Sequence, residues 1–354
     1  MRILVSGSSG LVGSALIAHL GGDVSPARAE RASFALPGRR DRAEVSCAAP
    51  SSSLPGPHEI VRLVRRPQRS DRTEIAWDPS ATQLDARPFA GFDVVVHLAG
   101  ESIAQGRWTE AKKARIRNSR VQGTRLLCEA LARSGRPPKV LISASAVGYY
   151  GDRGEEELDE ASGPGTGFLA ELCGDWEAAT EPVAATGVRV VLARFGVILA
   201  PHGGALPRLL RLFRFGLGGR LGSGRQYFSW IMLGDAVRAI CFAIENDLLQ
   251  GPVNLVAPNP VTNRELTAAL GRALRRPTLL PVPAWALRLA LGEMADAMLL
   301  ASTRVVPRQL QKHGYQFAYP TVQDALKAIV RAEPPRQSTG SGNASGSQGL
   351  PAQG

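Results

Sequence analysis

Three glycines near the start of the chain restrict its fold more than any other feature. A short apolar strand is predicted over residues 3–5, and leucines at helical spacing predict a helix over residues 11–20. The turn between them has the spacing G-x-x-G-x-x-G and contains Gly7, Ser9, Gly10, Leu11, Val12 and Gly13. Such glycines permit a tight turn, close backbone approach to a pyrophosphate, and close helix–strand packing. Because a helix start also offers free N–H groups to an anion, this turn predicts dinucleotide binding. The alternative is a strand-to-helix turn with a structural role only.

The residues at the end of the second predicted strand indicate which dinucleotide the chain binds. That strand covers residues 59–64 and is followed by Arg65 and Arg66, with no Asp or Glu at its end. An acid there would bind a ribose hydroxyl, whereas guanidinium groups suit a 2′-phosphate. We therefore expect NADP, and the alternative is a solvated basic turn.

The chain is basic, with 42 Lys and Arg against 31 Asp and Glu and a net charge of +11. The charge is scattered, so nucleic-acid binding is not expected. One local concentration consists of Arg208, Arg211, Arg214, Arg220 and Arg225. It indicates either a pocket for an anionic ligand or a solvated helix face.

The spacing of the cysteines and the hydropathy of the chain indicate the cellular compartment of the protein. The four cysteines are widely spaced, without metal-ligand spacing, which is typical of a reducing compartment. No apolar run approaches the ~18 residues that span a membrane. The first strand begins at the N-terminus and leaves no room for a signal peptide. We expect a cytoplasmic protein with no metal and no membrane contact.

Strands alternate with helices along most of the chain, which predicts an α/β fold with a Rossmann-type doubly wound parallel sheet. The dinucleotide-binding domain is expected over residues 1–21 and 58–200. A smaller C-terminal substrate lobe with a helical module is expected over 201–330, some of its segments returning to the sheet. Composition predicts a disordered insertion at 22–57 and a disordered tail at 331–354.

Several further motifs carry a family resemblance. They are the glycine turn, His97-Leu-Ala-Gly100, the segment 143–151 and Arg194-Phe-Gly196. Together they resemble the extended short-chain dehydrogenase/reductases, and more closely their atypical "epimerase family" branch. Segments 107–113, 221–226 and 228–231 belong to the same resemblance, which covers residues 1–21 and 58–330.

The resemblance implies roles for individual residues. Leu98, Ala99 and Gly100 would pass under the adenosine side of the cofactor. Arg120 would contact its phosphate or ribose, or else brace its own helix. The backbone at Ile198 would border the nicotinamide carboxamide, and the Ser145 hydroxyl would bond a substrate carbonyl oxygen.

The chain departs from the family in its catalytic pair. Family members normally use a Tyr-x-x-x-Lys helix, in which the lysine lowers the tyrosine pKa. The matching positions here hold Leu169 and Cys173. Tyr149 and Tyr150 are the nearby phenols that could exchange a proton instead, and the alternative is that they line the cofactor or substrate pocket. Without a lysine, a phenol with its ordinary pKa of about 10 is a poor base at neutral pH, so we expect slow turnover that rises with pH.

Two functions follow. The first is an NADP(H)-binding oxidoreductase or epimerase acting on a small polar or sugar-like substrate. The second is a non-catalytic NADP(H)-binding sensor or scaffold. The expected partners are a small-molecule substrate and, at most, a second copy of the chain in a homodimer.

Overall fold

The computed structural model describes residues 1–21, 58–67 and 73–332. The insertion expected over 22–57 lies outside the described residues, as does most of the expected tail. Helix α12 continues to Ala332, so the first two residues of the expected tail belong to a helix.

A seven-stranded parallel sheet forms the centre of the molecule, in the order β11-β7-β5-β4-β1-β2-β3. Its strands are β1 (Arg2–Ser6), β2 (Glu59–Val64), β3 (Glu74–Ala76), β4 (Val94–His97), β5 (Val140–Ala146), β7 (Arg189–Phe195) and β11 (Gly251–Leu255). The strand order reverses direction at β1 and β4. In such sheets a ligand binds in the crevice beyond the carboxyl ends of the strands at this point.

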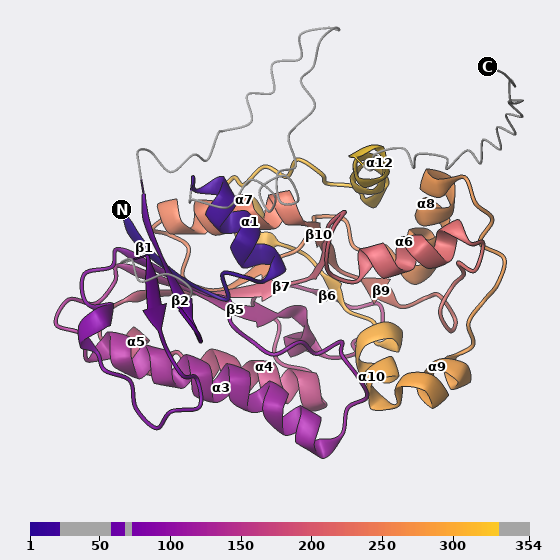
Figure 1. Ribbon diagram of the computed structural model, residues 1–354. Helices are drawn as coiled ribbons and strands as arrows, with labels where there is room; N and C mark the ends of the chain where they lie inside the picture. Colours follow the sequence, from indigo (N-terminus) through magenta and orange to yellow (C-terminus); the bar gives the residue numbers. More distant parts are fainter. Residues whose placement is uncertain (22–57, 68–72, 333–354) are drawn as a thin grey trace, which may run out of the picture.

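Helices cover both faces of the sheet (Figure 1). Helices α1 (Leu11–His19) and α7 (Leu233–Glu245) cover one face, and α3 (Glu110–Ala132), α4 (Phe168–Ala178) and α5 (Glu181–Ala184) cover the other. Successive side chains of a strand point to opposite faces of the sheet, so each strand contributes to the hydrophobic cores on both faces. In β1, Ile3 and Val5 pack on the α1 side and Leu4 packs on the α3 side. The expected doubly wound α/β fold is therefore confirmed.

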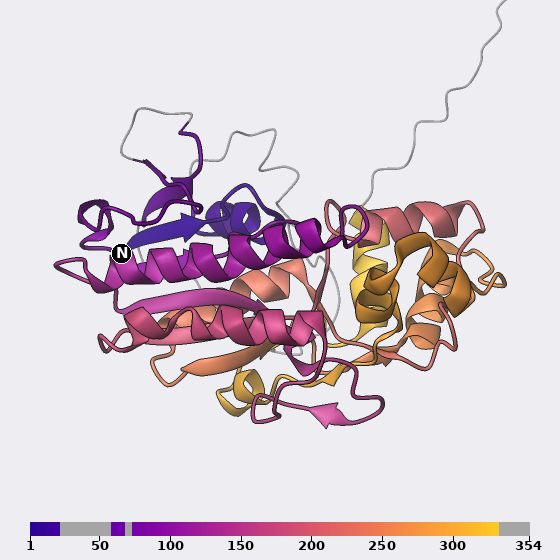
Figure 2. The ribbon, with the colours of Figure 1, turned by 90° about the horizontal axis from the view of Figure 1, so that it is seen from below.

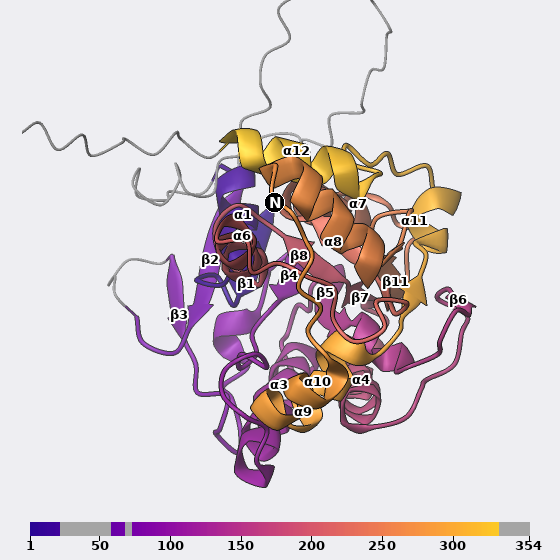
Figure 3. The same cartoon turned by 90° about the vertical axis from the view of Figure 1, so that its right-hand side faces the viewer.

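The C-terminal part forms a smaller lobe with its own core. Helices α6 (Leu206–Arg214), α8 (Asn263–Leu274) and α12 (Val322–Ala332) pack together there (Figure 3). In α12 the buried residues are Val322, Ala325, Leu326 and Ile329, which follow the helical period. The short strand pairs of this region are β8 (Val197–Leu199) with β10 (Trp230–Met232) and β9 (Tyr227–Phe228) with β12 (Val261–Thr262).

Two short helices connect this lobe to the base of the sheet domain. They are α9 (Ala284–Leu291) and α10 (Glu293–Ala295), which lie near the start of α3 (Figure 3). Lys113 on α3 forms an ion pair with Glu293 at 2.9 Å, and Arg107 donates to the carbonyl of Leu289 at 3.0 Å. Seen from below, α3 runs along the sheet toward the lobe (Figure 2).

The remaining strands and α-helix of the described residues are β6 (Glu157–Leu158), β13 (Arg304–Val305) and α11 (Arg308–Lys312), and short helical turns lie at Arg87–Phe89, Val147–Tyr150 and Asp296–Leu300. Within the described ranges, no helix combines the length and apolar character needed to cross a membrane.

Candidate functional site

The glycine turn joins β1 to α1 beneath the end of β4. Gly7 has a φ of +67°, and a Cβ added there would lie 2.6 Å from the carbonyl oxygen of Leu98. A Cβ on Gly13 would lie 2.4 Å from the carbonyl oxygen of Gly7. Both obstacles are backbone atoms, which cannot rotate away as a side chain could. The two positions therefore require glycine for the turn to keep its shape.

The start of α1 is open to an anion. Gly10 is its N-cap, no side chain caps the helix, and the Gly10 amide donates to the Gly7 carbonyl at 2.9 Å. Ser9 and Gly10 are exposed, while Leu11 and Val12 are half-buried. The first N–H groups of a helix lack partners within the helix and carry its positive dipole end. A dinucleotide pyrophosphate thus fits this turn on both shape and charge.

The end of β4 lies next to the glycine turn. Ser6 pairs with His97 across β1 and β4, and the Ser6 hydroxyl accepts from the Leu98 amide at 3.1 Å. The same hydroxyl lies 2.7 Å from Nδ1 of His97. His97 is fully buried, and burial lowers its pKa to about 4. A neutral histidine thus holds the strand end from which Ala99 and Gly100 continue.

Arg120 lies against this strand end. Its Nη1 donates to the Glu101 carbonyl at 2.9 Å, and its guanidinium lies 5.1 Å from the ring centre of Trp176. A Cβ on Gly100 would come within 3.1 Å of the guanidinium carbon. Burial lowers the pKa of Arg120. These contacts brace the loop after β4, and Nη1 also donates to the Ile116 carbonyl of its own helix at 3.4 Å. The expected contact with the cofactor stays a prediction.

Arg65 and Arg66 follow the carboxyl end of β2. Ser6 pairs with Leu63 in the sheet, so this end of β2 lies beside the turn that begins at Gly7. Both arginines are exposed. An adenosine 2′-phosphate beyond the end of β2 would lie within reach of such long basic side chains.

The other end of the crevice borders β8. Ile198 in this strand is half-buried, and the loop that follows contains Gly203 and Gly204. A Cβ on Gly203 would lie 3.1 Å from a methyl carbon of Leu11, and one on Gly204 would lie 3.6 Å from the Ile198 carbonyl oxygen. The loop after β8 therefore closes against the start of α1, which brings two predicted cofactor contacts to one crevice.

Ser145 lies at the end of β5 and is 2% exposed. Its hydroxyl donates to Glu177 at 2.6 Å, and it pairs with Arg194 across β5 and β7. Glu177 in turn binds Arg194 through both carboxylate oxygens at 2.8 Å each. The Ser145 proton is therefore committed to Glu177, and a substrate could receive it only after that bond breaks.

The two tyrosines after β5 have different surroundings. Tyr150 is fully buried, its hydroxyl donating to Asn254 at 2.8 Å and accepting from Arg194 at 2.9 Å. Burial raises the pKa of Tyr150 to about 12. Its hydroxyl cannot reach a substrate, so Tyr150 is removed from the pair of candidate proton donors. Tyr149 is half-buried, and the Arg194 guanidinium lies 3.6 Å from its ring centre.

The positions of the usual catalytic pair are apolar in this chain. Leu169 and Cys173 lie on α4 against Gly148, whose added Cβ would meet them at 3.3 Å and 3.8 Å. Burial raises the pKa of the Cys173 thiol to about 12, so it remains protonated at neutral pH. Cys173 is accordingly a packed thiol and has no role as a nucleophile.

Sequence reasoning gave no role in the site to three polar residues, namely Glu177, Arg194 and Asn254, although Arg194 belongs to a motif of the family resemblance. The side chains of Glu177 and Arg194 are 10% and 4% exposed. Burial disfavours the Arg194 cation, but its bonds to Glu177 outweigh this and raise its pKa. A charged residue in an otherwise apolar strand could have signalled the pair, because a buried charge requires a partner.

Comparison with known proteins agrees with this geometry. Residues 3–255 match the model of the NAD dependent epimerase/dehydratase family, and residues 282–329 match a domain of unknown function, DUF1731. An epimerase family protein of Mycobacterium bovis is 46% identical over 92% of this chain and 96% of its own length.

Two solved structures are similar over nearly the whole chain. Human epimerase family protein SDR39U1 (isoform2), crystallised with NADPH, has a TM-score of 0.77 and 32% identity, covering 94% of this chain and 99% of its own. A nucleoside-diphosphate sugar epimerase of Corynebacterium glutamicum has a TM-score of 0.69 and 34% identity, covering 93% of this chain and 58% of its own. The protein described here therefore belongs to the NAD dependent epimerase/dehydratase family.

Proposed function

We propose that this chain is an NADP(H)-dependent oxidoreductase or epimerase that acts on a small polar or sugar-like substrate. The observation that carries the proposal is the glycine turn at the start of α1, whose shape depends on Gly7 and Gly13. The basic end of β2 favours NADP(H) over NAD(H). The human relative that was crystallised with NADPH supports the same choice.

The substrate would lie at the end of β5, beyond Ser145 and beside Tyr149. Bound NADPH would supply a hydride to a substrate carbonyl carbon, and the carbonyl oxygen would then need a proton. Tyr149 is the half-buried phenol after β5, and no described residue forms a hydrogen bond with its hydroxyl. We therefore assign the proton to Tyr149, while Ser145 holds the Glu177–Arg194 pair in place under the Tyr149 ring.

A second candidate function is a non-catalytic NADP(H)-binding sensor or scaffold. The observation that favours it is the replacement of the usual Tyr and Lys by Leu169 and the neutral thiol of Cys173. Both candidates require the same cofactor turn, so cofactor binding alone does not separate them.

The separating experiment follows NADPH oxidation over a panel of aldehydes, ketones and keto-sugars, with Tyr149→Phe and its neighbour Tyr150→Phe. Tyr149→Phe should lower kcat by about two orders of magnitude, as expected for a lost general acid, and leave stability unchanged. Tyr150→Phe should leave kcat unchanged and lower the stability of the protein by about 1–3 kcal/mol, because it removes a buried hydroxyl with two hydrogen-bond partners. Activity that survives Tyr149→Phe would contradict the assignment. A folded, NADPH-saturated wild type that reduces none of the panel would favour the sensor or scaffold.

A further inference from the structure

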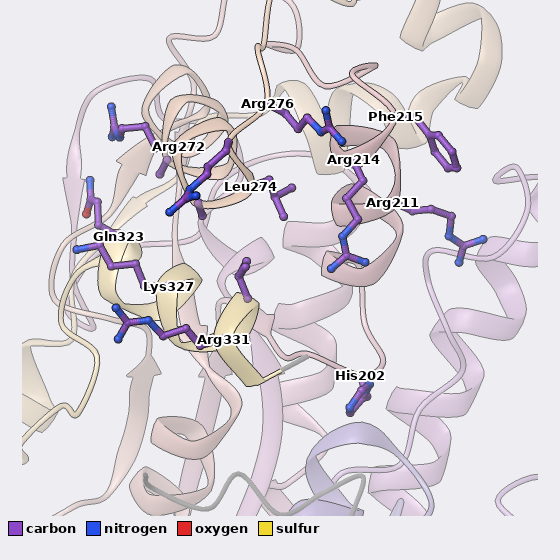
Figure 4. A pocket seen from close by; sticks show the side chains of 14 residues that line it. His202, Arg211, Arg214, Phe215, Arg272, Leu274, Arg276, Gln323, Lys327 and Arg331 are labelled. Atoms are coloured by element: carbon purple, nitrogen blue, oxygen red, sulfur yellow. The ribbon is translucent and has the colours of Figure 1, made fainter. Parts of the chain in front are cut away.

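A second basic site lies in the C-terminal lobe, apart from the crevice described above. A hollow of about 1360 Å³ is bordered by α6, α8 and α12, and we call it the arginine pocket (Figure 4). Its arginines are Arg211, Arg214, Arg272, Arg275, Arg276 and Arg331. Lys327 and His202 also line it, and the described lining residues include no Asp or Glu.

The basic side chains come from separate parts of the chain and surround one space. Figure 4 shows Arg211 and Arg214 on α6, Arg272 on α8 with Arg276 in the loop that follows, and Lys327 and Arg331 on α12. Such a concentration raises the energy of each cation through its like-charged neighbours. A bound anion with several charges would remove that repulsion.

Helix dipoles offset only a small part of the positive charge of the arginine pocket. Arg211 and Arg214 lie in the last turn of α6, and Arg272 lies in the last turn of α8. A helix C-terminus carries about half a negative charge, so these two helix ends offset about one charge of the set. Lys327 pairs with Asp324 at 3.6 Å, whereas carboxylates of the described residues leave three of the arginines without an ion pair, namely Arg272, Arg276 and Arg331.

One arginine of the pocket has a backbone conformation that favours glycine. Arg275 is the C-cap of α8 with φ 52° and ψ 47°, and it is the only non-glycine residue with positive φ in the described part of the chain. Glycine is the usual residue at such a left-handed helix end, because a Cβ is strained there. At this position the chain therefore carries a strained basic residue on the pocket wall.

We propose that the arginine pocket binds a small molecule bearing a polyphosphate chain. A single phosphate is held by one or two guanidinium groups, whereas these cations are spread over three helices. The walls also include Phe215 and Leu274, which could contact an organic group attached to the phosphates. A concave site suits a small ligand, while nucleic acid binds a continuous basic stripe. Among the pocket residues, His202 lies in the loop after β8 that borders the cofactor crevice, whereas Arg272 and Arg276 lie outside the residues assigned to the cofactor, so substitutions at these two arginines test the pocket separately.

The test is calorimetric titration of the full-length chain, already saturated with NADPH, at about 150 mM salt. The probes are ATP, inorganic tripolyphosphate and AMP. ATP and tripolyphosphate should bind, and AMP should bind at least about tenfold more weakly because it offers one phosphate. Tighter binding of ATP than of tripolyphosphate would assign the organic part to Phe215 and Leu274, and equal binding would assign recognition to the phosphates alone.

Two charge-matched double variants show where binding occurs. Arg272→Glu with Arg276→Glu reverses two charges in the pocket, and Arg208→Glu with Arg220→Glu reverses two exposed arginines outside it. The pocket pair should weaken ATP binding by at least about tenfold, while the outside pair changes it by less than about threefold. NADPH affinity should remain the same in both, which shows that each variant is folded. Arg275→Gly should weaken ATP binding while raising Tm, a combination that general unfolding cannot produce.

Three results would overturn the proposal. The first is wild-type protein, saturated with NADPH, that binds neither ATP nor tripolyphosphate. The second is an equal loss of ATP binding in both double variants. The third is tighter binding of single-stranded DNA or of anionic phospholipid vesicles than of ATP, lost equally in both double variants, which would indicate a general basic surface.

Discussion

Glu177 and Arg194 form a buried bidentate ion pair between α4 and β7, with both N–O distances at 2.8 Å. The pair lies under Tyr149 and also fixes Ser145 and Tyr150. It thus connects the stability of the fold to the shape of the proposed substrate site.

Glu177→Gln should destabilise the protein by about 3–5 kcal/mol, because Arg194 would remain buried without a countercharge. The measurement is urea unfolding at neutral pH, read as a change in midpoint. Glu171→Gln is the matched control on the same helix and is exposed, so its effect should stay within about 0.5 kcal/mol. Similar effects of the two variants would show that the buried pair does not hold the site together.

His97 should make stability fall between pH 6.5 and pH 4, since its pKa is lowered from 6.5 to about 4 by burial. In this window the unfolded chain binds a proton that the native state does not, so stability falls as the pH falls. The loss is about 1.4 kcal/mol per pH unit and about 3 kcal/mol in all. His97→Gln should remove this part of the slope when unfolding is measured across the same range. An unchanged slope would mean that native His97 takes up the proton.

The glycine turn should tolerate no side chain at Gly13. Gly13→Ala places a methyl group 2.4 Å from a backbone oxygen, so NADPH binding should be lost and Tm should fall. Gly174 is the matched control, since it lies inside α4 and an added Cβ there meets nothing within 4 Å. Gly174→Ala should stabilise the protein by about 0.5–1 kcal/mol and leave NADPH affinity intact. Normal NADPH affinity in Gly13→Ala would contradict the assigned turn.

Two substitutions at the end of α8 should have opposite effects on stability. Arg275→Gly removes left-handed strain and should stabilise the protein by about 1 kcal/mol. Arg272→Gly, three residues earlier and inside the helix, should destabilise it by about 1 kcal/mol. Thermal unfolding of both variants checks the pair. A fall in Tm for Arg275→Gly would show that contacts of this arginine outweigh its backbone strain.

Local sequence pattern pointed to much of the crevice that we propose for the cofactor. The glycine turn with the apolar run before it is one consecutive segment, and Leu98 to Gly100 is another, so each could be interpreted without a structure. The parallel sheet followed from the alternation of strands and helices. Its order reverses at β1 and β4, where the structure brings these segments together.

The polar network could not be predicted in the same way. Ser145 meets Arg194 only through the register of β5 on β7, and Glu177 reaches both from α4. Tyr149 and Tyr150 are adjacent in sequence, yet only the packing of Tyr150 onto Asn254 from β11 shows which hydroxyl is enclosed. The arginine pocket is a similar case. Of the five arginines that the sequence grouped, only Arg211 and Arg214 line it. The other arginines of the pocket come from α8, from the two residues that follow it and from α12.

The most direct test of the proposed function is calorimetric titration of the chain with NADPH and with NADH, repeated with Arg65→Ala and Arg66→Ala. NADPH should bind at least about tenfold more tightly, because one bidentate contact to the 2′-phosphate contributes about 1.5–3 kcal/mol. At least one of the two variants should lose this preference through weaker NADPH binding, with NADH affinity unchanged as the internal control. Equal affinity of the wild type for the two cofactors, or a preference that survives both substitutions, would contradict the assignment of the 2′-phosphate to the end of β2.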